Sequence, residues 1–251
     1  MTAQPANKWW WTSPAPAARV QLLCFPYAGG TTSVFRPWAE PLSGAIRLHI
    51  PRLPGRESRL NERGLDDMGA LLEGLASTLD VEPPYAMFGH SLGAIVAFEL
   101  ARYLRSAGRP LPLHLFLSGA PAPHIKQPLG LSGMSGNEFW ARLRDLNGVP
   151  AALLDNPEML ELIEPILKTD FAIDDRYVYT AQRPLPCPMT VLRGAADSHV
   201  NEAHAAGWAR HTSGAFVVEV IDGDHFFINS QRDRVLALIS RTLLVLTARD
   251  R

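Results

Sequence analysis

Short apolar runs alternate with longer amphipathic stretches along most of the chain. A continuous apolar run of about six residues is typical of a buried strand, whereas apolar positions three and four residues apart are typical of a helix. The pattern therefore predicts an α/β fold with a mostly parallel central sheet and helices on both faces. Strands are expected at 20–27, 46–51, 85–90, 113–118, 188–194 and 216–221, and helices at 33–42, 66–79, 92–108, 136–147, 156–171, 202–211 and 232–246.

The alternation breaks between residues 120 and 188, where two helices are expected and no core strand. A long excursion that returns to a strand is typical of an insertion over the C-terminal edge of the sheet. We therefore expect one domain, 1–251, with a mobile helical lid at 128–182. Its apolar side chains either contact an acyl chain or fix the insertion to the sheet: Phe139, Trp140, Leu143, Leu146, Leu153, Leu154, Met159 and Leu160.

The chain turns sharply at Gly-His-Ser-Leu-Gly, residues 89–93, between an apolar run and a strongly helical pattern. This has the form G-x-S-x-G, the nucleophile elbow, in which a serine on a strand-to-helix turn stands clear of the sheet. The helix N-terminus then points at Ser91, where negative charge would develop. A bare five-residue motif also arises in ordinary turns, but the flanking strand and helix favour the catalytic interpretation.

Composition narrows the class of protein. The 251 residues are 47% hydrophobic and 20% charged, with a formal net charge of −1, so nothing indicates a nucleic-acid partner. No apolar run reaches transmembrane length and no signal-like segment begins the chain, so we expect a cytoplasmic protein with no membrane partner. Cys24 and Cys187 lie in or beside apolar runs, which favours buried free thiols over a disulfide or a metal site.

Two further segments each allow two interpretations. Three adjacent tryptophans at 9–11 belong to an N-terminal arm that either packs on the body, which we favour, or offers a sticky surface to a partner. The loop at 52–64 contains four arginines among glutamates. It is either a docking surface for an acidic partner or, as we favour, a solvated loop with internal ion pairs.

The partners of Ser91 are predicted by position. In this architecture an acid follows a late strand and a histidine follows the last strand, so both reach the sheet edge where the serine lies. Asp197 and His225 occupy these positions. Among rival histidines, His49 and His114 fall inside strand patterns, His204 and His211 on an expected surface helix, and His90 in the elbow with its ring directed elsewhere. His124 and His199 are nearer the expected edge, but only His225 follows the last strand. Rival acids are either too close to His225 in sequence, as Asp222 and Asp224 are, or lie in the lid: Asp170, Asp174 and Asp175.

These residues permit acyl transfer through a covalent intermediate. His225 would take the proton of Ser91 while Asp197 fixes the imidazole tautomer. The oxyanion would bind two backbone N–H groups, one from Leu92 and one from the loop after the strand at 20–27, most simply that of Ala28. Glycines 29 and 30 let this loop approach closely, although glycine loops also occur merely as turns.

Several segments together resemble the type II thioesterases that accompany polyketide synthases and nonribosomal peptide synthetases. They are CFPYAGG (24–30), LPGRESR (53–59), GHSLGAIVAFELARYL (89–104), LSGAPAP (117–123), the stretch at 148–171, CPMTVLRGAAD (187–197) and GDHFFI (223–228). The resemblance covers nearly the whole chain after Val20. It implies an α/β-hydrolase with Ser91 as nucleophile, Asp197 as acid and His225 as base. Tyr27 stands where many members have His, and Leu92 where many have Met.

The resemblance implies hydrolysis of acyl thioesters on the phosphopantetheine arm of acyl or peptidyl carrier proteins, which removes stalled or wrongly loaded groups in antibiotic biosynthesis. It implies no metal and no cofactor beyond that arm, and we expect a monomer. Three alternatives remain open: a general carboxylesterase, a medium-chain acyl thioesterase acting with a fatty acid synthase, and a catalytically silent binding module. The intact Ser91, Asp197 and His225 argue against the last.

Overall fold

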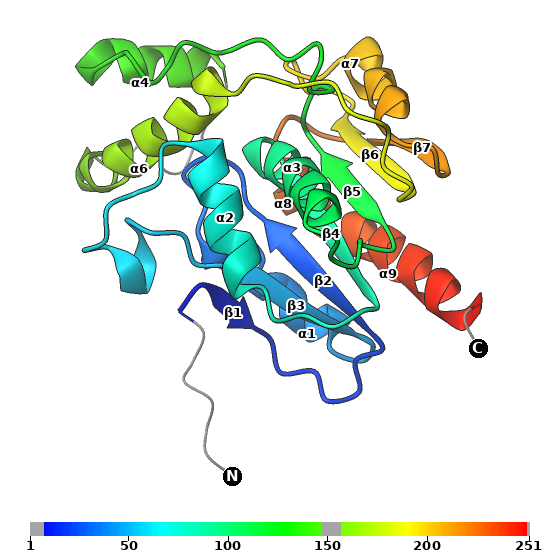
Figure 1. Cartoon of the computed structure of the whole chain (residues 1–251). Coiled ribbons are helices and arrows are strands. Elements are labelled where there is room, and N and C mark those ends of the chain that lie inside the picture. The colour runs from blue at the N-terminus through cyan, green and yellow to red at the C-terminus, as the bar shows by residue number, and fades with distance from the viewer. Residues whose placement is uncertain (1–7, 147–156, 250–251) are drawn as a thin grey trace.

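The computed structural model describes residues 8–146 and 157–249, and a seven-stranded sheet lies at the centre of this part of the chain (Figure 1). The strand order is β1-β3-β2-β4-β5-β6-β7. β2 to β7 are parallel, and β1 pairs with β3 in the antiparallel direction. The strands are β1 Trp10–Thr12, β2 Val20–Phe25, β3 Ile46–Pro51, β4 Tyr85–His90, β5 Leu115–Ser118, β6 Met189–Gly194 and β7 Phe216–Ile221.

Helices cover both faces of the sheet, as the alternating pattern predicts (Figure 1). Successive side chains of a strand point to opposite faces, so Met87 packs with α2 and α3 while Phe88 packs with α1 and α9. The α-helices are α1 Ala39–Leu42, α2 Met68–Thr78, α3 Leu92–Ser106, α4 Gly136–Asp145, α6 Pro157–Arg176, α7 Glu202–Ala206, α8 Phe227–Ser230 and α9 Arg232–Arg249. Short 3₁₀ turns are η1 Thr32–Val34, η2 Arg36–Trp38, η3 Glu57–Arg59 and η4 Gly207–His211.

The N-terminal arm contains a strand that the sequence pattern does not reveal. Trp10 to Thr12 pair with the far side of β3. The pattern does not reveal this strand because three residues are too few to show an alternation. The Trp10 ring is buried edge-on against Phe25, 6.2 Å between ring centroids, and its Nε1 lies 3.3 Å from Thr78 Oγ1. The packing interpretation of the arm is therefore confirmed for Trp10.

The arginine-rich loop is only partly the solvated loop that we favour from the sequence: Arg63 is exposed. Arg56 and Arg59 are both buried. Arg59 pairs with Glu62 at 2.7 Å and lies 4.2 Å above the ring of Trp9, so this part of the loop does form internal ion pairs. Arg56 reaches a partner in α6, more than a hundred residues further on, which no local pattern indicates.

Two thiols and a histidine are buried in the fold. Cys24 and Cys187 are free and buried, as predicted, and burial raises the pKa of each, that of Cys187 to about 11. His211 is expected on a surface helix, which is wrong: it is buried, its Nε2 lies 2.8 Å from His124 Nδ1, and burial lowers its pKa to about 4. No described helix is both long and apolar enough to cross a membrane.

Candidate active site

The elbow at Ser91 is as tight as the motif predicts. Ser91 has φ 55° and ψ −120° at the junction of β4 and α3, and its N–H donates to the carbonyl of Ser118 at 2.8 Å. A Cβ on Gly89 would lie 2.0 Å from the carbonyl oxygen of Gly93, and one on Gly93 would lie 2.1 Å from that of Phe25. Real side chains never approach so closely, so only glycine lets the strand and helix meet at this angle.

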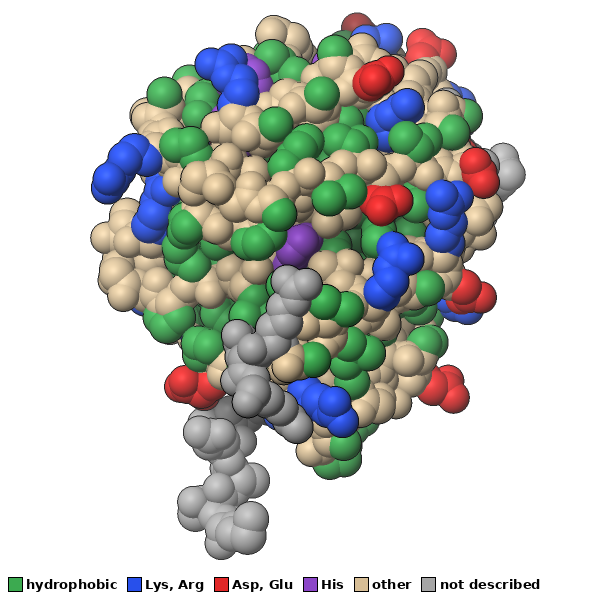
Figure 2. Space-filling model, turned by 90° about the vertical axis from the view of Figure 1, so that its right-hand side faces the viewer, with side chains coloured by type: hydrophobic (Ala, Val, Ile, Leu, Met, Phe, Trp, Pro, Cys, Tyr) green, Lys and Arg blue, Asp and Glu red, His purple; other side chains and the backbone are tan. Residues whose placement is uncertain are grey.

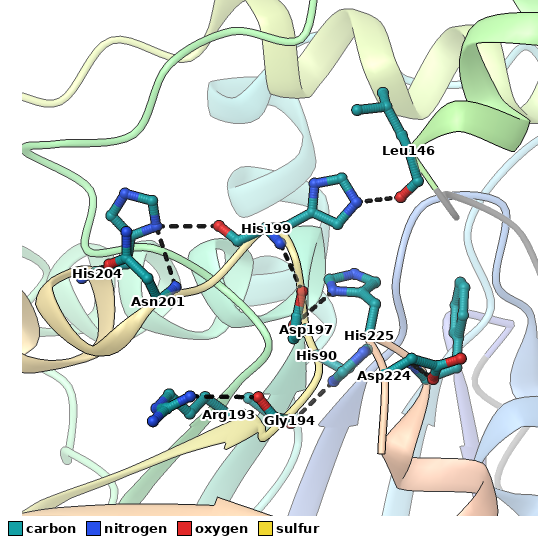
Figure 3. Close-up of polar contacts among 12 residues, drawn as sticks. His90, Leu146, Arg193, Gly194, Asp197, His199, Asn201, His204, Asp224 and His225 are labelled. Carbon is teal, nitrogen blue, oxygen red and sulfur yellow. Dashed lines mark hydrogen bonds and ion pairs between the residues drawn. The ribbon is translucent and has the colours of Figure 1, made fainter.

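Asp197 and His225 are brought into direct contact by the loops after β6 and β7 (Figure 3). His225 Nδ1 lies 2.9 Å from Asp197 Oδ2, and both residues are buried. The other carboxylate oxygen, Oδ1, accepts the backbone N–H of His199 at 2.8 Å. Because an ionised carboxylate only accepts hydrogen bonds, the imidazole proton is on Nδ1 and Nε2 keeps its lone pair.

The pKa of Asp197 is lowered by its surroundings. Burial alone acts in the opposite direction, by disfavouring the charged carboxylate, but the hydrogen bond and charge of His225 and the N–H of His199 outweigh it. Asp197 is therefore ionised at neutral pH and holds the His225 ring in one tautomer.

Two other histidines lie beside the His225 ring: His199, which the sequence places near the expected edge, and His90, whose ring we expect to be directed elsewhere, which is wrong. His90 lies 5.1 Å from it between ring centroids, with its Nδ1 2.9 Å from Ser118 Oγ, and burial with the nearby His225 lowers its pKa well below the usual value. His199 lies 5.2 Å away on another side, and its Nε2 contacts the carbonyl of Leu146 (Figure 3). Its place two residues after Asp197, near the expected edge of the sheet, is the sequence signal for this contact.

The rival acids are occupied elsewhere. Asp222 pairs with Arg234 at 3.4 Å, and Asp224 accepts the N–H of Phe226 at 2.8 Å. The three acids of α6 also have their own partners. Asp170 binds Arg56, Asp174 binds Lys126, and Asp175 accepts the N–H groups of Gly130 and Ser132.

A cavity of about 230 Å³ joins Ser91 and His225. Ala28 and Leu92, whose N–H groups are the expected oxyanion donors, also line it. Leu92 opens α3, and the first N–H groups of a helix have no acceptor within the helix. The expected nucleophile, base and oxyanion donors thus border one space, and Asp197 acts on it through its contact with His225.

The wall of the cavity is mostly apolar and comes partly from the insertion. Leu143 of α4, Leu146 just after it and Phe171 of α6 line it. One charged pair interrupts this wall: Lys126 Nζ lies 2.7 Å from Asp174 Oδ2. Burial raises the pKa of Asp174 despite the opposing charge of Lys126. Such a space suits an acyl chain.

Known proteins with similar sequences and structures identify the family of this chain. A family model described as a thioesterase domain matches residues 20–243. The chain belongs to the thioesterase family. This thioesterase is 38% identical over 242 residues to linear gramicidin dehydrogenase LgrE of Brevibacillus parabrevis, which covers 93% of this chain and 92% of the relative.

Two solved structures show the fold and the kind of thioesterase. The RedJ thioesterase from the prodiginine biosynthetic pathway in Streptomyces coelicolor shares 38% identity, with a TM-score of 0.84 over 95% of this chain and 90% of RedJ. The type II thioesterase BorB from the borrelidin biosynthetic cluster shares 33% identity, with a TM-score of 0.87 over 95% of this chain and 99% of BorB. This thioesterase is a hydrolase of the α/β-hydrolase fold, and the resemblance to type II thioesterases is confirmed.

Proposed function

We propose that this thioesterase hydrolyses acyl thioesters on the phosphopantetheine arm of acyl or peptidyl carrier proteins, as an editing enzyme of a polyketide or nonribosomal peptide pathway. The observation that carries the proposal is the Asp197–His225 pair at one end of an apolar cavity that Ser91 also lines. The relatives RedJ and BorB, each assigned to a biosynthetic pathway or cluster, support the choice of substrate carrier.

In the first half of the reaction, Ser91 takes the acyl group. Its Oγ attacks the thioester carbon while His225 Nε2 accepts the hydroxyl proton and Asp197 stabilises the imidazolium. The tetrahedral intermediate then expels the pantetheine thiolate, which takes up the proton that His225 removed from Ser91. The products are acyl-Ser91 and the free thiol of the carrier arm.

In the second half, water releases the acid. His225 removes a proton from a water molecule that attacks the ester carbon of acyl-Ser91, and it returns this proton to Ser91 Oγ as the ester bond breaks. In both halves the oxyanion accepts hydrogen bonds from the backbone N–H groups of Ala28 and Leu92. Loss of one such donor typically costs roughly 3 to 4 kcal/mol of transition-state stabilisation.

A redox function, which the name of LgrE suggests, has no support in this sequence. Dinucleotide-binding enzymes place the pyrophosphate on a G-x-G-x-x-G turn after the first strand. The corresponding turn reads Ala28-Gly29-Gly30-Thr31, and no two glycines of the chain are spaced as G-x-G. Hydrolysis therefore fits the residues better than hydride transfer.

The substrate is tested with one acyl group presented in three ways: on a carrier protein, on N-acetylcysteamine, and as a simple ester. We expect kcat/KM to be highest for the carrier-bound thioester by at least about tenfold, which is about 1.4 kcal/mol of additional transition-state binding. Preference for the simple ester would indicate a general carboxylesterase. Activity confined to medium-chain groups on a fatty acid synthase carrier would indicate the other alternative.

We further propose that residues 128–182 act as a lid whose anchor is the second half of α6. Figure 1 shows α4 and α6 together beside the C-terminal ends of the strands. The ion pairs of Asp170 and Asp174 tie the second half of α6 to the body. In α4, Phe139 and Trp140 are already buried in the core, so they favour the packing interpretation, whereas Leu143 also reaches the cavity. Leu153 and Leu154 lie outside the described residues.

Hydrogen exchange tests the lid. We expect amides of α4 to exchange faster than those of α3 and to gain protection when a carrier with a non-hydrolysable acyl-pantetheine binds. Amides of 170–176 should match α3 in both states, because buried ion pairs hold them. Equal and unchanged protection of α4 and α3 would show that the insertion is fixed scaffolding.

Three further properties are proposed: the need for a cofactor, the location and the oligomeric state. Each step uses side chains and backbone N–H groups of this chain, so we propose that it needs no metal and no cofactor of its own. Two buried free thiols fit a reducing compartment, which supports a cytoplasmic location. We also propose that the enzyme works as a monomer. Dialysis against a chelator and sedimentation of the active enzyme test the first and last of these.

A further inference from the structure

The loop that carries the Ala28 N–H is a tight turn. Its closing bond runs from the N–H of Gly30 to the carbonyl of Tyr27 at 2.9 Å. Gly29 has φ 77°, the value that the third residue of a type II turn takes. Ala28 is the second residue of this turn, so the direction of its N–H depends on how the turn as a whole is held.

A buried ion pair from two distant segments holds the two glycines of this turn. The N–H of Gly29 donates to Asp170 Oδ2 at 2.7 Å. Arg56 Nη1 donates to the same Oδ2 at 2.8 Å and to the carbonyl of Gly30 at 3.0 Å, and Nη2 donates to Asp170 Oδ1 at 2.6 Å. The side chains of Arg56 and Asp170 are only 4% and 3% exposed.

Further contacts from the same two segments restrict the turn. Leu167, also in α6, lies so close that a Cβ on Gly29 would be 2.6 Å from its Cδ2. Glu57, next to Arg56, accepts the hydroxyl of Thr32 at 2.6 Å. The turn is thus fixed from the α6 side and from the η3 side.

A buried ion pair is a poor way to gain stability, because the cost of removing both charges from water offsets most of their attraction. What it provides is geometry: the planar guanidinium binds both carboxylate oxygens in one orientation. Here that orientation directs one oxygen at the N–H of Gly29, next to the proposed oxyanion donor.

We propose that Arg56 and Asp170 are positioning residues that hold the Ala28 N–H at the oxyanion, and so couple α6 to the catalytic centre. This inference rests on the proposed role of Ala28 in thioester hydrolysis. Displacement of the second half of α6 would release the turn, so the hole is complete only while that half-helix is docked.

The test compares variants that weaken the pair to different degrees. Asp170→Asn keeps an acceptor for Gly29 but loses the charge. Arg56→Lys keeps the charge but loses the two-point contact. Arg56→Met with Asp170→Leu replaces the pair by apolar side chains and leaves no buried charge unpaired. The control is Glu62→Gln, which breaks the Arg59–Glu62 pair of the same loop without touching the turn.

For each variant kcat, KM, the inhibition constant of an acyl trifluoromethyl ketone and the melting temperature are measured. The ketone adds to Ser91 and places an oxyanion in the hole, whereas KM reports ground-state binding when chemistry is slow. We expect kcat to fall about tenfold to a hundredfold, less than the loss of a whole donor. The inhibition constant should rise by a similar factor, with KM nearly unchanged.

We expect Glu62→Gln to keep the wild-type constants, and Arg56→Lys to lie between the wild type and the apolar double variant. Wild-type kcat and inhibition constant in a folded Asp170→Asn or Arg56→Lys variant would overturn the inference, as would a loss of rate that only follows the folded fraction. Ser91→Ala separates the two proposals. If that variant is inactive while the positioning variants are normal, the inference fails alone; if it is active, the proposed mechanism fails.

Discussion

Replacement of Ser91 by Ala is expected to lower thioester hydrolysis on the order of a millionfold while leaving the fold intact. The large loss follows because nucleophile and base act as a unit, so removal of the hydroxyl leaves only binding and the oxyanion donors. The fold should survive because the change deletes one oxygen facing the cavity and keeps the backbone N–H that bonds to Ser118. The rate on an acyl carrier protein and the melting temperature measure the two effects.

A trapped intermediate provides the direct check on Ser91. Incubation of the wild type with a slow thioester should add the acyl mass to the peptide that contains Ser91, and the alanine variant should remain unmodified. Ser106→Ala is the matched control, because it makes the same chemical change at the far, exposed end of α3. We expect that variant to keep full activity. An adduct on another residue, or full activity of Ser91→Ala, would contradict the mechanism.

The order of strands and helices was predictable because each buried strand of a parallel sheet is a continuous apolar run between amphipathic helices. The same topology explains why the contact of Asp197 with His225 was expected: each follows a neighbouring parallel strand, so both emerge at one edge. The elbow glycines were equally legible, because the backbone of Gly89 and Gly93 leaves no space for a side chain.

The sequence did not predict contacts between segments that are far apart in the chain, because no local pattern of apolar positions links them. Arg56 and Asp170 are 114 residues apart, and the sequence near each suggests only a polar loop and an acidic helix. Their burial depends on α6 lying against the turn after β2, which is a property of the tertiary fold. Likewise β1 is too short to show alternation, and its place is set by the free edge of β3.

The parts of the proposed machinery are held by different elements of the fold. Ser91 is fixed by the elbow and His225 by Asp197, both through short loops of the central sheet. The turn at Ala28 is instead held by α6, which belongs to the insertion. Under the proposed role of Ala28, the oxyanion site therefore depends on the second half of α6, which is the anchored part of the insertion.

Asp197→Asn is expected to lower the rate about 10⁴-fold, the size of effect that this change has in serine triads. The amide keeps the shape of the carboxylate, but its NH₂ can donate to His225 Nδ1. The ring then carries its proton on Nε2, where it cannot accept the proton of Ser91. Because the fault lies in the tautomer, KM should change little and the loss should appear in kcat.

The same substitution has a signature in the pH dependence of stability. The folded-state pKa of Asp197 is depressed, so ionisation of this group stabilises the fold above its unfolded pKa of about 4 and the contribution is lost as the pH falls through the folded value. Wild-type stability should therefore decline below about pH 4 more steeply than that of Asp197→Asn. The measurement is denaturant unfolding across this range.

Asp222→Asn is the matched control for Asp197→Asn, since it makes the same change at an exposed carboxylate after β7 whose partner is Arg234. We expect it to keep the wild-type rate and the wild-type pH dependence. The assignment of the acid is wrong if Asp197→Asn is nearly as active as the wild type and a substitution in α6, such as Asp170→Asn, removes the base function of His225. In that case the pH–rate profile of the Asp170 variant would change shape, whereas loss of a mere positioning contact lowers kcat and leaves the shape of the profile unchanged.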